Sequence, residues 1–348
     1  MTAPAKAPGR RRLEDALQAL WRGRGPGSTA LLPLACLYGI LSQRRMARQA
    51  RNAWRAAVPV IVIGNILVGG TGKTPVAQAV CQYLQSIGRR PGLISRGYGS
   101  HVGAEPHLSD QRRDSRWLGD EPALLHAATG VPVAVHPQRA RAARALLATH
   151  PDTDVLIADD GLQHRALARD VEIIVQDSRG IGNGRLLPAG PLREPPARLA
   201  RADWLITHLS PGQTPPIGDA PAGRARAVAM RLQPGYLVQC ATQARLDWPD
   251  WQARYGRETC HAAAGIGQPQ RFFDMLRQAG LRLDRTLATP DHRAASLAQL
   301  QALPPGPILI TAKDAVKQAR IDDPRIWTVY PTPWFSDPDW LAALARQI

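Results

Sequence analysis

Short apolar runs alternate with stretches of helical periodicity from residue 60 onward. The first run, Val60–Ile63, is β-branched throughout, as in a strand that is buried on both faces. Pro75–Ile87 has apolar residues at helical spacing and predicts a helix. Further strands are predicted at Pro91–Ser95, Val131–Val135, Asp154–Ala158, Val171–Val175, Trp204–Thr207, His261–Ala264, Arg282–Ala288, Ile308–Thr311 and Ile326–Tyr330. Further helices are predicted at Glu121–Ala128, Arg139–Thr149, Phe272–Ala279, from Ser296, and at Trp340–Ala345. This alternation predicts a mainly parallel sheet with helices on both faces.

The pattern also divides the chain. A Pro- and Gly-rich stretch at 213–223 is predicted to be a linker between a core at 58–212 and a second, smaller α/β domain at 224–348. Just after this stretch, Ala225–Arg231 and Tyr236–Cys240 are expected to form a strand pair. Residues 1–57 form a separate basic segment.

Charge is concentrated at the beginning of the chain. The 348 residues carry a formal net charge of +16, and residues 1–57 hold eleven Lys or Arg against only Glu14 and Asp15. Such a segment suits either nucleic acid or an anionic membrane surface. A nucleic-acid binder would interleave aromatic residues with its basic patches, but only 5% of this chain is aromatic. We therefore expect a membrane surface and no nucleic acid. The four cysteines form no CxxC pair, which argues against a zinc site and for a reduced compartment.

The basic segment contains one apolar run, Ala30–Leu41. Its twelve residues are fewer than the ~20 that a membrane-spanning helix needs, and arginines follow it instead of a cleavage site. Two interpretations remain open. The run is either a helix packed on the protein's own core or a membrane-interfacial helix whose flanking arginines meet lipid headgroups.

A glycine-rich loop follows the first strand and precedes the first helix, which is the context of a phosphate-binding loop. Its glycines allow backbone N–H groups to approach phosphate oxygens, and the helix N-terminus adds a positive dipole end. Lys73 is placed to reach the β- and γ-phosphates, and the Thr74 hydroxyl to bind Mg²⁺. Leu67 stands where the common G-x-x-x-x-G-K-[ST] pattern has glycine. The residues predicted to bind the nucleotide are Gly69, Gly70, Thr71, Gly72, Lys73 and Thr74.

Two classes of P-loop protein fit poorly. Partition-type ATPases carry a lysine where this chain has Val68. GTPases read guanine with [NT]-K-x-D, whereas Lys313 and Asp314 are adjacent here.

Further polar clusters fall at strand ends or helix starts, where open α/β sheets bind ligands. They are Ser95–Gly99, Gly119–Pro122, Asp159–His164, Gly182–Pro195, Gly265–Pro269, Arg271–Phe273, Asp291–His292 and Thr311–Lys317. Taken in this order, they resemble the tetraacyldisaccharide 4′-kinase family of lipid A biosynthesis over roughly residues 30–320.

The resemblance implies a P-loop NTPase-like fold and an ATP-dependent kinase that uses Mg²⁺. Its acceptor would be the 4′-hydroxyl of an acylated glucosamine disaccharide 1-phosphate. The enzyme would be peripheral or monotopic at the cytoplasmic face of the bacterial inner membrane, and no protein partner is evident.

The resemblance also implies roles for single residues. Asp120 resembles the family's catalytic base, with His292 as its partner, although a helix N-cap is an alternative for Asp120. The family commonly shows a second histidine after Asp-His, where this chain has Arg293. Asp159, at the end of an apolar strand, is a candidate Mg²⁺ ligand, and it or Asp160 alternatively caps the following turn. The remaining candidates are Asp160 and Arg193 as catalytic residues, Glu194 near the nucleotide, and Gln163 and His164 as either site or structure. For Arg193 and Glu194 the alternative is a solvated ion pair.

Overall fold

The computed structural model describes residues 16–100, 102–210, 212–214, 223, 225–290, 293–317 and 321–348. Most of the predicted linker at 213–223 lies outside these residues. The strands form one continuous mixed sheet in the order β11-β10-β12-β13-β8-β7-β6-β1-β5-β2-β4-β3, with β9 paired to β8. They are β1 (Val60–Gly64), β2 (Pro91–Ser95), β3 (His107–Leu108), β4 (Val133–Val135), β5 (Val155–Asp159), β6 (Val171–Asp177), β7 (Trp204–His208), β8 (Arg226–Gln239), β9 (Arg245–Asp247), β10 (Cys260–Ala264), β11 (Leu283–Ala288), β12 (Ile308–Thr311) and β13 (Ile326–Phe335).

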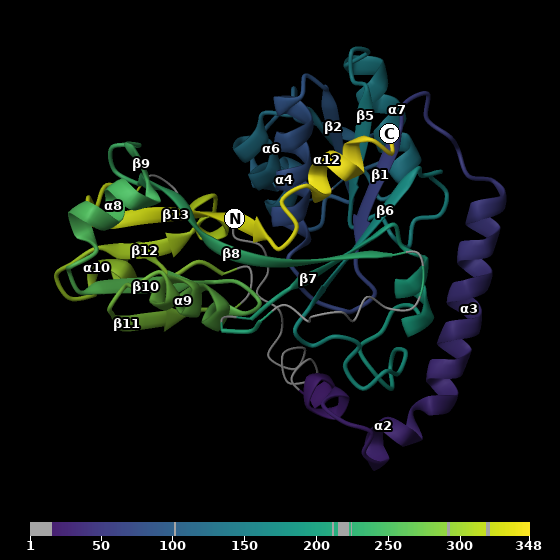
Figure 1. Ribbon diagram of the computed structural model, residues 1–348, viewed down its shortest axis with the longest axis horizontal. Coiled ribbons are helices and arrows are strands. Elements are labelled where there is room, and N and C mark those ends of the chain that lie inside the picture. Colours follow the sequence, from purple (N-terminus) through teal and green to yellow (C-terminus); the bar gives the residue numbers. More distant parts are fainter. Residues whose placement is uncertain are drawn as a thin grey trace.

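Helices cover both faces of the core sheet, as the pattern predicted (Figure 1). On one face, Val80 and Leu84 of the helix at 73–86 and Trp340 of the C-terminal helix pack against the sheet. On the other face, Ala143 and Leu146 of the helix at 139–149 do so. The helices are α2 (Pro26–Ala30), α3 (Leu32–Arg51), α4 (Lys73–Ser86), α5 (Ser115–Leu118), α6 (Asp120–Thr129), α7 (Arg139–Thr149), the 3₁₀ helix η1 (Pro196–Arg201), α8 (Trp248–Tyr255), α9 (Pro269–Gln278), α10 (Leu297–Gln301), α11 (Ala312–Ala315) and α12 (Trp340–Ala345). The fold is therefore α/β with mostly parallel strands.

One prediction in this region is wrong. The expected strand pair after residue 224 is a single long strand, β8, which runs parallel to β7 and then antiparallel to β13. Pro234 and Gly235, which lie between the two predicted runs, accommodate a register shift opposite Tyr330 and Pro331. A Cβ on Gly235 would lie 2.0 Å from the Thr332 hydroxyl oxygen, so the close approach of β13 requires glycine. The long strand joins the core to the C-terminal lobe, by which we mean the part built on β9–β12 and the first half of β13 (Figure 1).

Most of the apolar run at 30–41 belongs to α3, a 20-residue helix that begins at Leu32 and lies at the periphery of the molecule (Figure 1). Only its Ala35 and Gly39 are buried, whereas the side chains of four large apolar residues are about half exposed. These are Leu34, Leu37, Ile40 and Leu41. In the described part of the chain, no helix has the length and apolar character needed to cross a membrane.

Candidate active site

The loop between β1 and α4 has the strand–loop–helix geometry that the sequence predicted, and α4 begins at Lys73 with Thr74 as its second residue. Gly69 and Gly72 adopt φ values of 99° and 95°, a region that favours glycine. A Cβ on Gly72 would also lie 2.6 Å from the Nδ1 atom of His208. The loop can therefore hold its backbone close to a ligand only with glycine at this position.

Two buried side chains brace the loop from inside. The Asn65 amide donates to the Gly69 carbonyl oxygen at 3.1 Å and to the Thr71 hydroxyl at 3.3 Å. Both Asn65 and Thr71 are fully buried. The Thr71 side chain therefore supports the loop from within. That Thr71 contacts the nucleotide, through its backbone, stays a prediction.

An arginine that the sequence analysis did not single out supports the loop from outside. Arg179 donates to the carbonyl oxygens of Val68 at 3.4 Å and Gly70 at 3.2 Å. Its Nε also donates to both carboxylate oxygens of the buried Asp177. Arg271 of the C-terminal lobe reaches the same carboxylate at 3.0 Å. Burial favours the neutral form of Asp177, but the two arginines outweigh this effect and lower its pKa.

Three predicted residues meet at the start of α4. The Lys73 ammonium lies 3.4 Å from the Asp160 carboxylate, and Arg193 approaches the same oxygen at 3.5 Å. Burial alone would raise the pKa of Asp160, but Lys73, Arg193 and Arg139 outweigh burial and lower it. Asp160 is one of few non-glycine residues with positive φ, here 49°, which aspartate tolerates better than most residues. The site therefore holds an ionised carboxylate among cations.

Asp159 lies at the carboxyl end of β5 and is 1% exposed. Burial, followed by the charge of Glu121, raises the pKa of its carboxyl group to about 7. Among the described residues its Oδ1 atom has no hydrogen-bond partner. A buried carboxylate oxygen that lacks a hydrogen-bond partner suits a hard divalent cation. The Thr74 hydroxyl oxygen is a second possible ligand for such a cation. Within the described ranges, no three or more His, Cys, Asp or Glu side chains lie together as a metal-binding group.

Asp120 is the first residue of α6 and not its N-cap, so the alternative interpretation of Asp120 as a cap is wrong. The N-cap is Gly119, whose φ of 92° places Asp120 at the start of the helix. The next residue, Glu121, was not predicted as a site residue. Its carboxylate lies 2.7 Å from the Lys313 ammonium, and Lys313 and Lys73 together outweigh burial and lower its pKa.

Arg193 and Glu194 do not form a solvated ion pair, so that alternative is also wrong. Arg193 points at Asp160 and lies 3.4 Å from the Asn65 side-chain oxygen. Glu194 is 3% exposed and accepts a hydrogen bond from the Gln163 amide at 2.9 Å. Gln163 also donates to the Asn65 carbonyl oxygen, which ties Glu194 to the phosphate loop from behind. A contact of Glu194 with nucleotide stays a prediction.

The two candidate histidines differ. His292 lies outside the described residues, so its pairing with Asp120 stays a prediction. Burial and the neighbouring Arg139 and Arg96 lower the pKa of His164 to about 4. His164 is therefore neutral at physiological pH.

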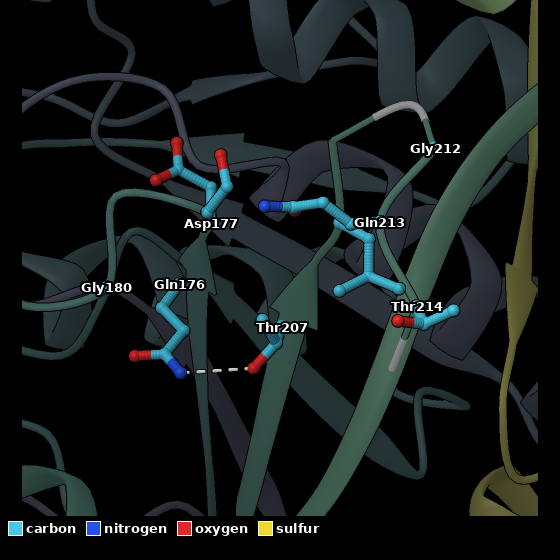
Figure 2. Close-up of a pocket in the computed structure, with 9 residues that line it drawn as sticks. Gln176, Asp177, Gly180, Thr207, Gly212, Gln213 and Thr214 are labelled. Carbon is cyan, nitrogen blue, oxygen red and sulfur yellow. Dashed lines mark hydrogen bonds between the residues drawn. The ribbon is translucent and has the colours of Figure 1, made fainter. Parts of the chain in front are cut away.

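An open cavity of about 440 Å³ lies at the carboxyl ends of β6 and β7 (Figure 2). Figure 2 shows the Gln176 amide bonded to the Thr207 hydroxyl, at 3.0 Å, while Asp177 points the other way. The cavity is lined by Gln176, Asp177, Ser178, Gly180, Thr207, Leu209, Gly212, Gln213 and Thr214.

Fold and site together define a P-loop nucleotide-binding protein. A glycine-rich strand–loop–helix turn carries the lysine, and the buried Asp159 and the partly exposed Asp160 lie at the end of the neighbouring strand. The family model of the tetraacyldisaccharide-1-P 4′-kinases matches residues 27–348. A tetraacyldisaccharide 4′-kinase of Bordetella parapertussis is 50% identical over 341 residues, which cover 96% of this chain and 97% of the relative. That of Methylibium petroleiphilum is 42% identical over 354 residues, with 98% and 95% covered. The chain belongs to the tetraacyldisaccharide 4′-kinase family, as the resemblance implied.

The fold has a counterpart among solved structures. A crystal structure of LpxK from Aquifex aeolicus in complex with ATP matches with a TM-score of 0.74 at 24% identity. The match covers 92% of this chain and 99% of that chain. The P-loop NTPase-like fold is thereby confirmed.

Proposed function

We propose that this protein transfers the γ-phosphoryl group of ATP to the 4′-hydroxyl of a tetraacyldisaccharide 1-phosphate. The observation that carries the proposal is the convergence of Lys73 and Arg193 on Asp160 beside the phosphate loop, in a chain of this family. Phosphoryl transfer is catalysed mainly by positioning and by cations that stabilise charge on the transferred group. The cavity at the ends of β6 and β7 has the size to receive the nucleoside end of ATP, and its Asp177 holds the arginine that supports the loop.

We further propose that Thr74 and Asp159 hold Mg²⁺ together with the nucleotide phosphates. The support is the buried Asp159 oxygen that has no partner among the described residues. The bound ion would neutralise charge on the phosphate oxygens.

Asp120 is the proposed general base, with His292 as its partner from the C-terminal half of the chain. The acceptor hydroxyl loses its proton to Asp120 as the oxygen–phosphorus bond forms, and the bond between the β–γ bridging oxygen and the γ-phosphorus breaks to release ADP. Lys73 and Arg193 would hold the γ-phosphoryl oxygens during this step.

The acceptor is a glycolipid, and α3 offers a route to it. Its exposed apolar face and the basic residues Arg44, Arg45, Arg48 and Arg51 suit the surface of an anionic bilayer. The Tyr38 hydroxyl on this helix donates to the Arg193 carbonyl oxygen at 3.3 Å, so α3 touches the loop that carries a site residue. We propose peripheral or monotopic attachment at the cytoplasmic face of the inner membrane.

Transfer of label from γ-labelled ATP to a tetraacyldisaccharide 1-phosphate in mixed micelles tests the proposal. The wild type should label the lipid, and Lys73→Ala should lower kcat by a factor of about 10²–10³, as loss of a transition-state charge contact does elsewhere. Lys73→Ala should remain folded at the assay temperature, as circular dichroism can show, so that the loss is one of chemistry. An unlabelled lipid with the wild type, or full activity in Lys73→Ala, would contradict the proposal.

A further inference from the structure

Thr311–Lys317, a cluster that the proposed mechanism does not use, reaches the site from the C-terminal lobe. Lys313 follows β12 on the short helix α11, and its ammonium lies 2.7 Å from the Glu121 carboxylate on α6. The two residues are 192 positions apart in the sequence. The ion pair therefore connects the C-terminal lobe with the helix that begins at the proposed base, Asp120.

The turn that carries Lys313 is firmly held in the lobe. The buried Asp314 accepts hydrogen bonds at one oxygen from the Thr311 hydroxyl at 2.6 Å and from the Gly265 amide at 2.9 Å. The Thr311 hydroxyl in turn accepts from the Asp314 amide at 3.2 Å and caps α11. Lys317 lies 3.7 Å from the other Asp314 oxygen. Because the turn is fixed to two strand ends, the position of Lys313 follows the sheet of the lobe.

The partner carboxylate is equally well placed. Glu121 is the second residue of α6, and the first hydrogen bond of that helix, from the Ala123 amide to the Gly119 carbonyl oxygen, spans it at 3.1 Å. A contact at Glu121 therefore acts on the turn that orients Asp120.

Residue type supports a specific role for this cation. The chain has 44 Lys and Arg residues, and its only lysines are Lys6, Lys73, Lys313 and Lys317. Lys73 and Lys313 both contact carboxylates at the site. A lysine ammonium is a compact point charge, whereas a guanidinium is a broad planar fork.

We propose that Lys313 is a positioning residue for phosphoryl transfer: its ion pair with Glu121 fixes the start of α6, and with it Asp120, against the C-terminal lobe. The inference rests on the proposed kinase function. It gives the C-terminal lobe a role at a site that is built on the P-loop core.

The test compares Lys313→Met, which removes the charge and keeps the length, with Lys313→Arg, which keeps the charge. Arg277→Met is the matched control, because Arg277 forms a 3.0 Å ion pair with Asp274 inside the same lobe and does not reach the core. Lys313→Met should lower kcat for label transfer about 10- to 100-fold, the scale of a small misplacement of catalytic groups. The Kd for ATP should stay within about twofold, and Arg277→Met should behave as wild type. Lys313→Arg should recover part of the rate, because it restores the positive charge but not the compact ammonium group.

A second readout does not depend on the reaction. Hydrogen exchange at the Ala123 amide should accelerate at least about tenfold in Lys313→Met and not in Arg277→Met, because the first turn of α6 loses its restraint. Unchanged exchange, or a kcat within twofold of wild type, would overturn the inference. A parallel loss of activity and melting temperature without rescue by arginine would do the same, since it would indicate a role in folding only. A wild type that transfers no label contradicts the proposed function instead, and the exchange result still decides the inference.

Discussion

Replacing Asp159 with asparagine should stabilise the ligand-free protein while it weakens Mg²⁺–ATP binding. The carboxyl group is fully buried, and burial together with the charge of Glu121 raises its pKa from 3.8 to about 7. At about 1.36 kcal/mol per pKa unit, this difference corresponds to roughly 4 kcal/mol that the ionised group costs the native state.

The sign follows from proton binding. Well below pH 3.8 the group is protonated in both native and unfolded protein, and the cost is absent. Between that value and pH 7 the native state binds more protons than the unfolded state, so stability falls as pH rises. Asparagine is neutral throughout. The gain in unfolding free energy of Asp159→Asn should therefore be about 1 kcal/mol at pH 4.5 and about 4 kcal/mol at pH 8.

Urea unfolding in EDTA at these two pH values measures the gain, with Asp152→Asn as the control. Asp152 is an exposed carboxylate 3.4 Å from Arg90, and its replacement should change stability by less than about 0.5 kcal/mol. Saturating Mg²⁺–ATP should then stabilise the wild type by RT ln(1 + [L]/Kd) and Asp159→Asn far less. A variant that is less stable than wild type at pH 8, or a gain independent of pH, would refute the reasoning.

Three further outcomes follow from the site and from α3. Gly72→Ala should destabilise the protein by about 1–3 kcal/mol and weaken ATP binding at least tenfold, because the φ of Gly72 is 95° and an added Cβ would meet His208. Urea unfolding and nucleotide titration measure the two effects. Asp120→Ala and His292→Ala should each lower kcat strongly. The loss in the double variant should be much smaller than the sum of the two single losses, whereas additive losses would argue against a proton-transfer pair. Replacing Leu34, Leu37, Ile40 and Leu41 with serine should lower binding to anionic vesicles at least about 100-fold, because each side chain buried in a bilayer contributes about 1.5–3 kcal/mol. Activity in micelles should stay unchanged. Retained vesicle binding would remove α3 as the anchor.

The phosphate loop could be located from the sequence because all its determinants are local. A β-branched run, a set of glycines and an apolar-periodic stretch follow one another within 30 residues, and each depends on short-range geometry. Asp159 and Asp160 could be predicted as site residues for a related reason. Residues that end parallel strands meet at one edge of the sheet.

What the sequence analysis missed depends on contacts between distant positions. Nothing near Glu121 indicates that Lys313 will neutralise it, and nothing near Arg179 indicates that it will brace the carbonyl groups of the loop. A strand pair was predicted in place of the single strand β8 because only the pairing with β13 shows that a bulge at Gly235 lets the strand continue. Asp120 was open to interpretation as an N-cap because the left-handed φ of Gly119 is visible only in the structure.

The position of the new phosphate on the product distinguishes transfer to the 4′-hydroxyl from every other use of ATP. The product of a reaction with ATP, Mg²⁺ and a tetraacyldisaccharide 1-phosphate would be examined by ¹H–³¹P correlation spectroscopy. We predict one new phosphomonoester coupled to the proton on the 4′ carbon, and at least about 100-fold slower formation of this product with Lys73→Ala. A new phosphate at another carbon, a pyrophosphate at the 1-position, or ATP hydrolysis with no phosphorylated lipid would contradict the account.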